Sequence, residues 1–326
     1  MDKISWGIIG CGDVTEVKSG PAFNKVSNSQ LMAVMRRNAE KVKDYAFRHN
    51  VPKWYTDATE LINDPDVNAI YIATPPSTHE QYTLAALQAG KPVYVEKPMS
   101  LNAASAGRMA NAAKQRNIKL SVAHYRRAQP IFKKINQLLQ EKIIGDLRFV
   151  KSDLYKRSLT KEELEVPKAA WRVDPAIAGG GLFHDLSPHQ LDLMLYFFGD
   201  PVHASGIATN QGGSYIADDL VAGNILFKNG VVFNGVWCFN VSEEGEKDQC
   251  EIFGSNGKIC FSFFEHRPLT VTVNGETKNF SFEGLQHVQQ PMIEKVVEYF
   301  LDKGTNPCSG EEGAVVMKLI DDFTKK

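Results

Sequence analysis

Asp185 and His189 are the pair of side chains whose types and spacing point most directly to chemistry. An imidazole has an ordinary pKa of about 6.5, so His189 can accept or donate a proton near neutral pH. If the segment is helical, the two side chains share one face, and the Asp185 carboxylate can orient the imidazole or bind a substrate hydroxyl. The pair predicts a general acid or base at His189, the alternative being a helix-face histidine bonded to backbone.

Two neighbouring side chains have lesser expected roles. His184 is expected to be structural, and Asp192, one turn beyond His189, to orient or solvate it. Asp185, His189 and Asp192 together resemble a metal site made of two histidines and one carboxylate, but only one of the three is a histidine. No metal site is therefore predicted.

The run Gly10-Cys11-Gly12-Asp13-Val14 directly follows the first strand-like segment. Glycines at such a place allow a tight turn and let a pyrophosphate approach backbone N–H groups at a helix start. The motif alone is a weak signal, because Thr15 replaces the usual third small residue and Gly20-Pro21 must interrupt the next helix. Its position in a strand–turn–helix unit at the chain start favours dinucleotide binding over an ordinary turn.

Arg36 and Arg37 stand where the second strand-like segment ends, after Met35. An NAD-preferring site usually has an acidic residue there, which accepts from the ribose hydroxyls. Two arginines instead suit the 2′-phosphate of NADP, because a guanidinium forms charge-assisted pairs with phosphate. The sequence therefore predicts NADP as the preferred cofactor, with NAD possible, unless both arginines are simply solvated.

Length and composition limit the classes of protein to which the chain can belong. With 326 residues it is too long for one ordinary core, and its net charge of −1 gives no general reason to bind nucleic acid or an anionic membrane. The sequence has no apolar run of about 18 residues and no signal-peptide pattern at its start. Its 5 cysteines form no C-x-x-C pair and are expected to be reduced, so we expect a cytoplasmic protein of two domains.

The first part of the chain alternates short apolar runs with amphipathic stretches, which is typical of a doubly wound α/β domain with a parallel sheet. The expected strands are 4–9, 31–35, 69–73, 92–95 and 120–123. The expected helices are 39–49, 58–63, 79–89 and 103–116.

The second part contains three Asn-Gly pairs, each between strand-like segments: Asn229-Gly230, Asn256-Gly257 and Asn274-Gly275. Such pairs are strong hairpin signals, so a largely antiparallel sheet is predicted from about 146 to 285. Helices are expected at 130–141, 189–198, 292–301 and 311–325. The predicted fold class is thus an N-terminal Rossmann domain over 1–123 and a C-terminal α+β domain with an open, mainly antiparallel sheet over 124–326.

Longer motifs make the interpretation more specific. Ala73-Thr74-Pro75-Pro76 is followed by His79 and then by Glu96-Lys97-Pro98, and later come Trp171-Arg172 and a triple glycine that leads into His184 and Asp185. In this order and spacing the motifs resemble the Gfo/Idh/MocA oxidoreductase family, the family of glucose-fructose oxidoreductase and inositol dehydrogenase. The resemblance covers essentially the whole chain.

The resemblance implies hydride transfer between NAD(P) and a sugar, polyol or related hydroxy or keto compound. It implies that Lys97 hydrogen-bonds the reacting oxygen, and the catalytic set is then Lys97, His189 and Asp185. The substrate set is Lys97, Tyr125, Arg126, Asp185 and His189, although the residues after the last Rossmann strand can also simply face water. The cofactor set is Gly10, Cys11, Gly12, Asp13, Val14, Arg36, Arg37, Thr74, Pro75, Pro76, His79, Glu96, Lys97, Trp171 and Arg172. For Glu96, a contact to the cofactor ribose and a structural role are equally open.

The family also leaves other functions and assemblies to weigh. A regulatory protein that binds NAD(P) without turnover and a glycosidase that retains NAD are the alternatives, and the presence of Lys97, Asp185 and His189 together argues against the regulator. Family members commonly pair through the open sheet, and the few helices of the second part can cover only one of its faces. A homodimer or homotetramer is therefore expected, because soluble monomers rarely leave a large apolar face in water.

Overall fold

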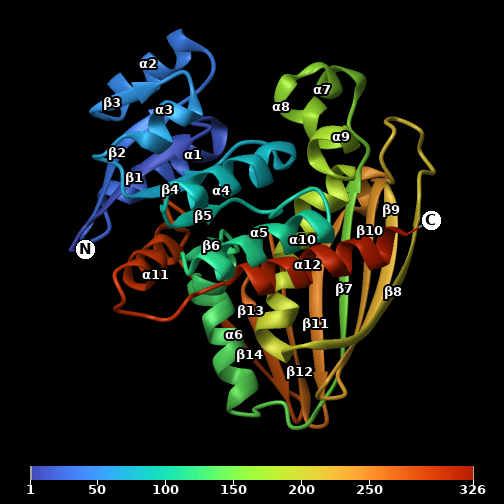
Figure 1. The fold of residues 1–326 in the computed structure, drawn as a ribbon. Coiled ribbons are helices and arrows are strands. Elements are labelled where there is room, and N and C mark those ends of the chain that lie inside the picture. The colour runs from blue at the N-terminus through green and yellow to red at the C-terminus, as the bar shows by residue number, and fades with distance from the viewer. Residues whose placement is uncertain (1, 326) are drawn as a thin grey trace. The chain divides into compact units, whose positions relative to one another are not determined.

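The structure is a computed structural model that describes residues 2–325, apart from the side chain of Lys168 (Figure 1). The chain forms two compact units. The first comprises the residues up to Gln129 together with Leu285–Met317, and the second comprises Pro130–Gly284 together with the residues from Lys318 on. The predicted division at 123/124 does not include the return of 285–317 to the first unit.

Within the described residues, a sheet of 6 parallel strands forms the centre of the first unit, in the order β3-β2-β1-β4-β5-β6. The strands are β1 Ile4–Ile9, β2 Ser29–Met35, β3 Lys53–Tyr55, β4 Ala69–Ile72, β5 Val93–Val95 and β6 Leu120–Val122. All predicted strands form, and β3 is an addition. The strand order reverses between β1 and β4, and open α/β sheets bind ligands at the carboxyl ends of the strands beside such a point.

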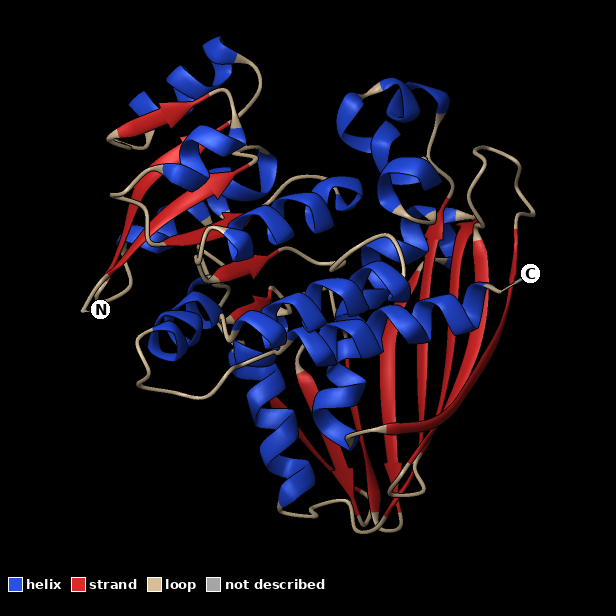
Figure 2. Ribbon diagram, viewed as in Figure 1, coloured by secondary structure: helices blue, strands red, loops and turns tan. Residues whose placement is uncertain are grey.

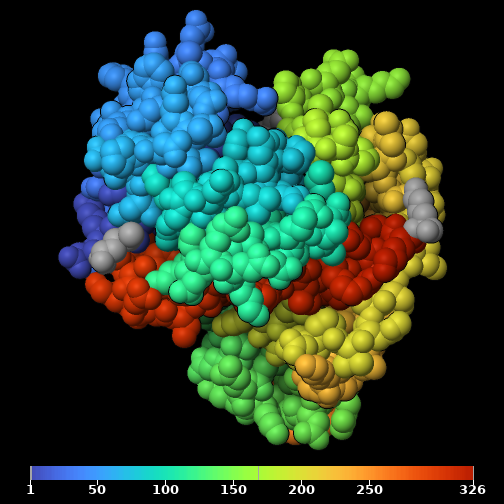
Figure 3. Space-filling view, in the orientation of Figure 1, coloured from blue at the N-terminus to red at the C-terminus, as the bar shows by residue number. Residues whose placement is uncertain are grey.

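Three helices of the first unit begin at a polar side chain that caps them. Asn38 accepts from Lys41 N–H, Asp57 from Thr59 and Glu60 N–H, and Asn102 from Ser105 N–H. The helices and 3₁₀ turns are α1 Asp13–Val17, η1 Gly20–Asn24, α2 Ala39–Arg48, α3 Ala58–Asn63, η2 Pro76–Thr78, α4 His79–Gln88, α5 Ala103–Arg116, η3 Tyr125–Ala128 and α11 Gln290–Phe300. The polar side of α5 is part of the surface in Figure 3.

Helix α11 belongs to the first unit because its apolar face completes that unit's core. Met292, Val296 and Phe300 are buried in the same cluster as Trp6 and Phe23. The Trp6 ring lies 4.9 Å from the Phe23 ring and 5.5 Å from the Phe300 ring, between centroids. Burying such aromatic side chains supplies a large share of core stability, so the core of the first unit needs the returning segment.

A sheet of 8 strands forms the second unit, described here within residues 130–284, in the order β14-β13-β12-β11-β7-β10-β9-β8. Its strands are β7 Leu147–Arg157, β8 Pro201–Thr209, β9 Leu220–Phe227, β10 Val232–Val241, β11 Lys247–Gly254, β12 Gly257–Phe261, β13 Leu269–Val273 and β14 Glu276–Phe280. Only β7 and β10 pair in parallel, so the mainly antiparallel sheet is confirmed. All three Asn-Gly pairs connect hairpins, but only Asn274-Gly275 has positive φ at both residues.

Helices cover one face of this sheet (Figure 2). They are α6 Pro130–Gln140, α10 Gly181–Phe198 and the end of α12 Gly310–Thr324. Phe132 of α6 packs against Phe261, and Gln190 of α10 accepts from the Trp237 indole N–H. Phe323 of α12 lies against Gly206 and Gly223, where a Cβ would come within 3 Å of it. The predicted helices α6, α10 and α12 are thus present, and α10 begins earlier than expected.

The opposite face of the sheet is mixed in character. Phe149 and Phe253 stack there with centroids 4.5 Å apart, and Val232 is 38% exposed. In the next row Lys151 is in register with Glu251, so charged side chains lie beside the aromatic pair. The exposed face is therefore less apolar than the sequence suggested.

Short helices that the sequence did not signal connect β7 with α10. They are α7 Lys161–Glu165, α8 Pro167–Ala170, η4 Trp171–Val173 and α9 Pro175–Ala178. Thr160 and Glu163 form a capping box at the start of α7. Among the described residues, no helix is both long enough and apolar enough to cross a membrane.

Candidate functional site

The glycine motif lies at the carboxyl end of β1, and the lack of a side chain matters for a different reason at each of its two glycines. Gly10 has φ +95°, and a Cβ there would lie 2.8 Å from Thr74 N, so neither conformation nor space admits a side chain. Gly12 has ordinary extended backbone at the start of α1, and a Cβ there would meet nothing nearer than 3.9 Å. Packing therefore requires Gly10, whereas Gly12 keeps open a place where a ligand can approach backbone.

Thr15 and Gly20 replace the missing third small residue of the motif. Thr15 is buried, and its hydroxyl donates to the Gly12 carbonyl at 2.8 Å. A Cβ on Gly20 would lie 2.2 Å from the Thr15 carbonyl oxygen and 2.3 Å from the Tyr45 hydroxyl. The predicted interruption of the helix is confirmed, since α1 ends at Val17 and η1 begins at Gly20. Gly20, which lies outside the sequence motif, is therefore a second position where the backbone and α2 approach too closely for a side chain.

Arg36 follows β2 beside the glycine motif. Its guanidinium donates to the Cys11 carbonyl at 3.3 Å, and the Cys11 and Gly10 N–H groups donate to Met35 O. Cys11 is buried, and burial raises the pKa of its thiol to about 12. Arg37 is exposed to solvent. The structure thus brings Arg36, more than Arg37, to the backbone expected to hold a dinucleotide.

The segment Thr74-Pro75-Pro76 follows β4, and buried His79 joins it to Pro98. One ring nitrogen of His79 lies 2.7 Å from Thr74 O, and the other lies 3.0 Å from Pro98 O. Burial lowers the pKa of His79 to about 4, so the ring is neutral near pH 7. A neutral imidazole has one N–H, so His79 can donate to only one of these two carbonyl groups and packs against the other, from inside the unit.

Glu96 and Lys97 follow β5, next to β4 in the sheet. Glu96 is 5% exposed, and its Oε1 accepts from the Tyr71 hydroxyl and from Gln289 Nε2, at 2.5 and 2.6 Å. Its Oε2 accepts from Lys97 N–H at 3.1 Å, and the Lys97–Pro98 peptide is cis. Lys97 is half-buried. The buried carboxylate thus supports the backbone of the lysine that follows it.

Tyr125, Arg126 and Arg127 form the turn η3 after β6. Tyr125 is buried, and the Arg126 guanidinium lies 5.7 Å from its ring centroid. Arg127 is buried and donates to Glu312 at 2.5 Å. Arg127 therefore has an ion pair inside the first unit, while Tyr125 and Arg126 stay predictions as substrate residues.

In the second unit, α10 carries Asp185 and His189 on one face, as the helical interpretation of the sequence predicted. Asp185 Oδ2 accepts from Arg172 Nε at 3.1 Å, and the Arg172 guanidinium lies 4.6 Å from the Trp171 ring centroid. His189 is buried, with its ring centroid 5.8 Å from that of Phe264. The structure thus brings Trp171 and Arg172, predicted for the cofactor, next to the predicted catalytic carboxylate.

The triple glycine before Asp185 is explained by the start of α10. Gly179 and Gly181 have φ of +96° and +77°, and a Cβ on Gly180 would lie 2.1 Å from the His184 ring. His184 is buried, and burial lowers the pKa of its imidazole to about 4. His184 is thus a buried neutral side chain that the glycines accommodate.

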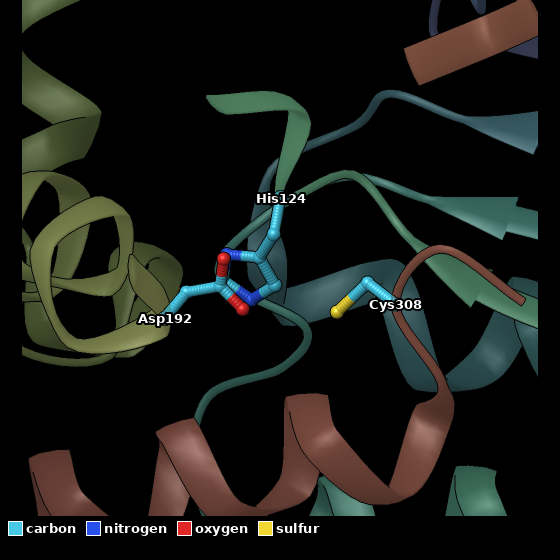
Figure 4. Close-up of side chains that lie close together, drawn as sticks. All are labelled: His124, Asp192 and Cys308. Carbon is cyan, nitrogen blue, oxygen red and sulfur yellow. The ribbon is translucent and has the colours of Figure 1, made fainter. Parts of the chain in front are cut away.

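His124 and Cys308 are both buried in the first unit, and their side chains are drawn in Figure 4. His124 follows β6, and Cys308 O accepts from Val122 N–H of the same strand. Two donors from one unit are fewer than the four protein ligands of a structural zinc site. That the chain has no metal site stays a prediction.

The predicted site residues divide between the two units. Those of the first unit are Gly10, Cys11, Gly12, Asp13, Val14, Arg36, Arg37, Thr74, Pro75, Pro76, His79, Glu96, Lys97, Tyr125 and Arg126. Those of the second unit are Trp171, Arg172, Asp185 and His189. Sequence reasoning missed Tyr71 and Gln289, the donors to Glu96. Tyr71 resembles any tyrosine of a buried strand, and Gln289 is 193 residues from Glu96, so no local pattern could join them.

Comparison with known families and proteins gives a consistent result. Residues 4–124 match the model of the oxidoreductase family with an NAD-binding Rossmann fold, named GFO_IDH_MocA. Residues 132–260 match the GFO/IDH/MocA C-terminal domain. The two matches follow one another along most of the chain.

Individual relatives extend the comparison. Oxidoreductase P35 of Formosa agariphila is 48% identical over 323 residues, which cover 98% of each chain. The scyllo-inositol 2-dehydrogenase (NADP(+)) IolW of Bacillus subtilis is 33% identical over 202 residues, 62% of this chain and 53% of that one. A levoglucosan dehydrogenase structure, in complex with NADH and levoglucosan, superposes with a TM-score of 0.87 at 21% identity, over 98% of this chain and 96% of that one. That structural likeness confirms the fold.

Two of the buried histidines, His79 and His184, predict how stability depends on pH. Burial lowers the pKa of His79 and His184 to about 4, below the unfolded value of about 6.5. Below pH 6.5 the unfolded chain binds protons that the folded chain does not, so stability is present above that pH and falls toward pH 4. Each of the two histidines should lower the free energy of unfolding by about 2 kcal/mol at pH 5 relative to pH 7.5. We expect His184→Gln to lose that much less than wild type between pH 7.5 and pH 5, measured by urea unfolding.

The exposed His203 provides the matched control. His203→Gln should keep the wild-type loss between the two pH values. An equal loss in both variants would show that His184 does not contribute to the acid sensitivity.

Proposed function

The chain belongs to the Gfo/Idh/MocA oxidoreductase family, and from that premise we propose that it transfers a hydride between a nicotinamide dinucleotide and a sugar, polyol or related hydroxy or keto compound. One observation carries the proposal. Gly12, Arg36 and Lys97 each follow the carboxyl end of a parallel strand, β1, β2 and β5, in a sheet whose order reverses beside β1. Ligands of open α/β sheets bind at that edge.

Lys97 is the group we assign to the reacting oxygen. Partial negative charge builds on the reacting oxygen when the hydroxyl proton leaves ahead of the hydride, and also when a hydride adds to a carbonyl, and an ammonium group stabilises that charge. Glu96 beside it is buried among hydrogen-bond donors of the first unit, so Lys97 is the charged group of the Glu-Lys-Pro motif that we assign to ligand.

His189 is the group we assign to proton transfer, with Asp185 as its neighbour on α10. A bound dinucleotide would take or give the hydride, and the hydroxyl proton must then move to or from a protein group. The Arg172 contact at 3.1 Å fixes one oxygen of Asp185, which limits how that carboxylate can turn toward imidazole or substrate. Similarity to a scyllo-inositol dehydrogenase and to a levoglucosan dehydrogenase supports a polyhydroxylated substrate.

NADP is the cofactor we propose as preferred, because Arg36 lies against the glycine motif with its guanidinium 3.3 Å from Cys11 O. A 2′-phosphate can pair with such a guanidinium, whereas a carboxylate at this position would repel it. One relative carries NADP(+) in its name and one similar structure contains NADH, so relatives alone do not decide the preference.

A homodimer through the uncovered face of the eight-stranded sheet is the assembly we propose. Phe149, Phe253 and Val232 form an apolar row there, beside the charged pair Lys151 and Glu251. An apolar row rimmed by charges is typical of a surface that pairs with another protein surface.

A turnover screen tests the reaction. Wild type should oxidise or reduce at least one member of a panel of sugars, inositols, their keto forms and small diols, with NADP or NAD in either redox state. We expect Lys97→Met to lower kcat by about 10²-fold or more, because it loses the group that stabilises the developing charge.

His189→Asn should lower kcat by roughly 10²–10⁴ and remove one limb of the pH profile.

Lys228→Met is the control, since Lys228 is 68% exposed in a surface pair. It should turn over like wild type, and near-normal turnover in Lys97→Met would contradict the assignment of Lys97. Dinucleotide binding with no turnover in wild type would favour the regulatory alternative, and tightly retained cofactor with no net redox change would favour the glycosidase.

Cofactor preference is tested at Arg36. We expect kcat/KM for NADPH to exceed that for NADH by roughly 10- to 100-fold in wild type, because hydrogen bonds to charged groups contribute about 1.5–3 kcal/mol each. Arg36→Asp should remove the preference, whereas Arg37→Asp should keep most of it, since Arg37 is exposed. Equal efficiency with both cofactors in wild type would contradict the role of Arg36.

Sedimentation velocity tests the assembly. Wild type at micromolar concentration should sediment as a dimer or larger, and Phe149→Lys should shift it toward monomer by placing an unpaired charge in the apolar row. Phe47→Lys, at a side chain that is 85% exposed in the first unit, is the matched control and should sediment like wild type. A monomeric wild type would refute the proposed dimer.

A further inference from the structure

We propose that Tyr71 and Gln289 are positioning residues that act on Lys97 through Glu96. The inference rests on the proposed function in one respect, that Lys97 takes part in turnover. It concerns contacts within the first unit only.

Three distant parts of the chain meet at the Glu96 carboxylate. Tyr71 comes from β4, Glu96 directly follows β5, and Gln289 directly precedes α11. Tyr71 and Gln289 are 0% exposed and Glu96 is 5% exposed. A buried carboxylate is costly unless donors surround it, and here the Tyr71 hydroxyl and the Gln289 amide both donate to Oε1. These two hydrogen bonds offset the free-energy cost of burying the Glu96 carboxylate and fix where it lies.

The Tyr71 hydroxyl stays a donor throughout the working pH range. Burial first, and then the Glu96 carboxylate, raise the pKa of Tyr71 well above its ordinary value. Its oxygen also lies 3.2 Å from Ser19 Oγ, and Ser19 Oγ lies 3.3 Å from Val14 O of the glycine motif. Because the Tyr71 proton goes to Glu96, the single Ser19 proton can serve only one of these two contacts.

Both the backbone and the side chain of Gln289 make hydrogen bonds. Its backbone N–H donates to Lys18 O at 3.2 Å, and the neighbouring His287 ring contacts Val17 O at 2.6 Å. Its side chain makes no capping bond to α11 and donates to Glu96 instead. The backbone of Gln289 is thus fixed on the segment that follows α1, and its side chain reaches Glu96 from there.

A single hydrogen bond joins the Glu96 side chain to the backbone of the next residue, Lys97. Glu96 Oε2 accepts from Lys97 N–H at 3.1 Å, and on the other side Pro98 O contacts the buried His79 ring. The backbone on both sides of Lys97 is therefore tied to buried groups. Because a misplacement of about 1 Å can cost about 10²-fold in rate, loosening Glu96 should lower kcat through Lys97.

Tyr94 offers a matched control for Tyr71. The two residues are in register on β4 and β5, both 0% exposed, and their rings stack with centroids 5.2 Å apart. Among the described residues, the Tyr94 hydroxyl has no hydrogen-bond partner. Tyr71→Phe and Tyr94→Phe thus remove the same atom from neighbouring places in one core, and only the first removes a donor to Glu96.

Steady-state kinetics with the best substrate of the screen give the first test. We expect Tyr71→Phe and Gln289→Leu to lower kcat about tenfold or more and to shift the pH profile of kcat, while dinucleotide Kd stays within about threefold. Tyr94→Phe should keep wild-type kcat and pH profile. Equal kinetics in Tyr71→Phe and Tyr94→Phe would overturn the proposal and leave the network a purely structural one.

Chemical labelling gives a second test that does not need turnover. Reductive methylation followed by mass spectrometry reports the initial labelling rate of Lys97 relative to exposed Lys228 in the same protein. Tyr71→Phe should change this ratio about fivefold, the equivalent of one ordinary hydrogen bond, and Tyr94→Phe should not change it. A changed ratio without any turnover in wild type would retain the positioning role and reject the proposed reaction, and an unchanged ratio would reject the positioning role.

Discussion

The buried carboxylate of Glu96 is the group on which the arrangement of the first unit depends. A carboxylate taken out of water must be surrounded by donors, and β5 cannot supply them alone. One donor comes from the adjacent strand and the other from a residue near the end of the chain, Gln289. The return of 285–317 to this unit therefore completes a polar site as well as the apolar core around Trp6.

Elements with strong local signals could be predicted from sequence, and elements without them could not. The fully buried strand β1 and the helices α3 and α5 match their predicted ranges, because the burial pattern and the end caps are encoded within each segment. Strand β3 has three residues and none is buried, so no apolar run marks it. The short helices α7 to α9 carry too few residues for a helical period to be visible.

In the candidate site, too, residues with a local sequence signal could be predicted and residues that depend on distant contacts could not. Glycine positions, Arg36 and the Asp185–His189 spacing are local, and the structure places them as the sequence indicated. Gly20 and Gln289 were missed because each matters through a distant contact, with Tyr45 in one case and Glu96 in the other. Arg172 shows a further limit, since a motif gives a residue's place in the chain and not the carboxylate to which it donates.

Glu96 illustrates how geometry separates two roles that the sequence leaves equal. A carboxylate has about four acceptor sites, and here donors from the protein already occupy three of them, two on Oε1 and one on Oε2. Little acceptor capacity is left for a cofactor ribose, and a ribose hydroxyl would have to compete with donors that are fixed and buried. The geometry thus favours support of the next residue over ligand contact. The three residues of the Glu-Lys-Pro motif need not share one chemical role, because Glu96 and Pro98 can hold the backbone from which Lys97 acts.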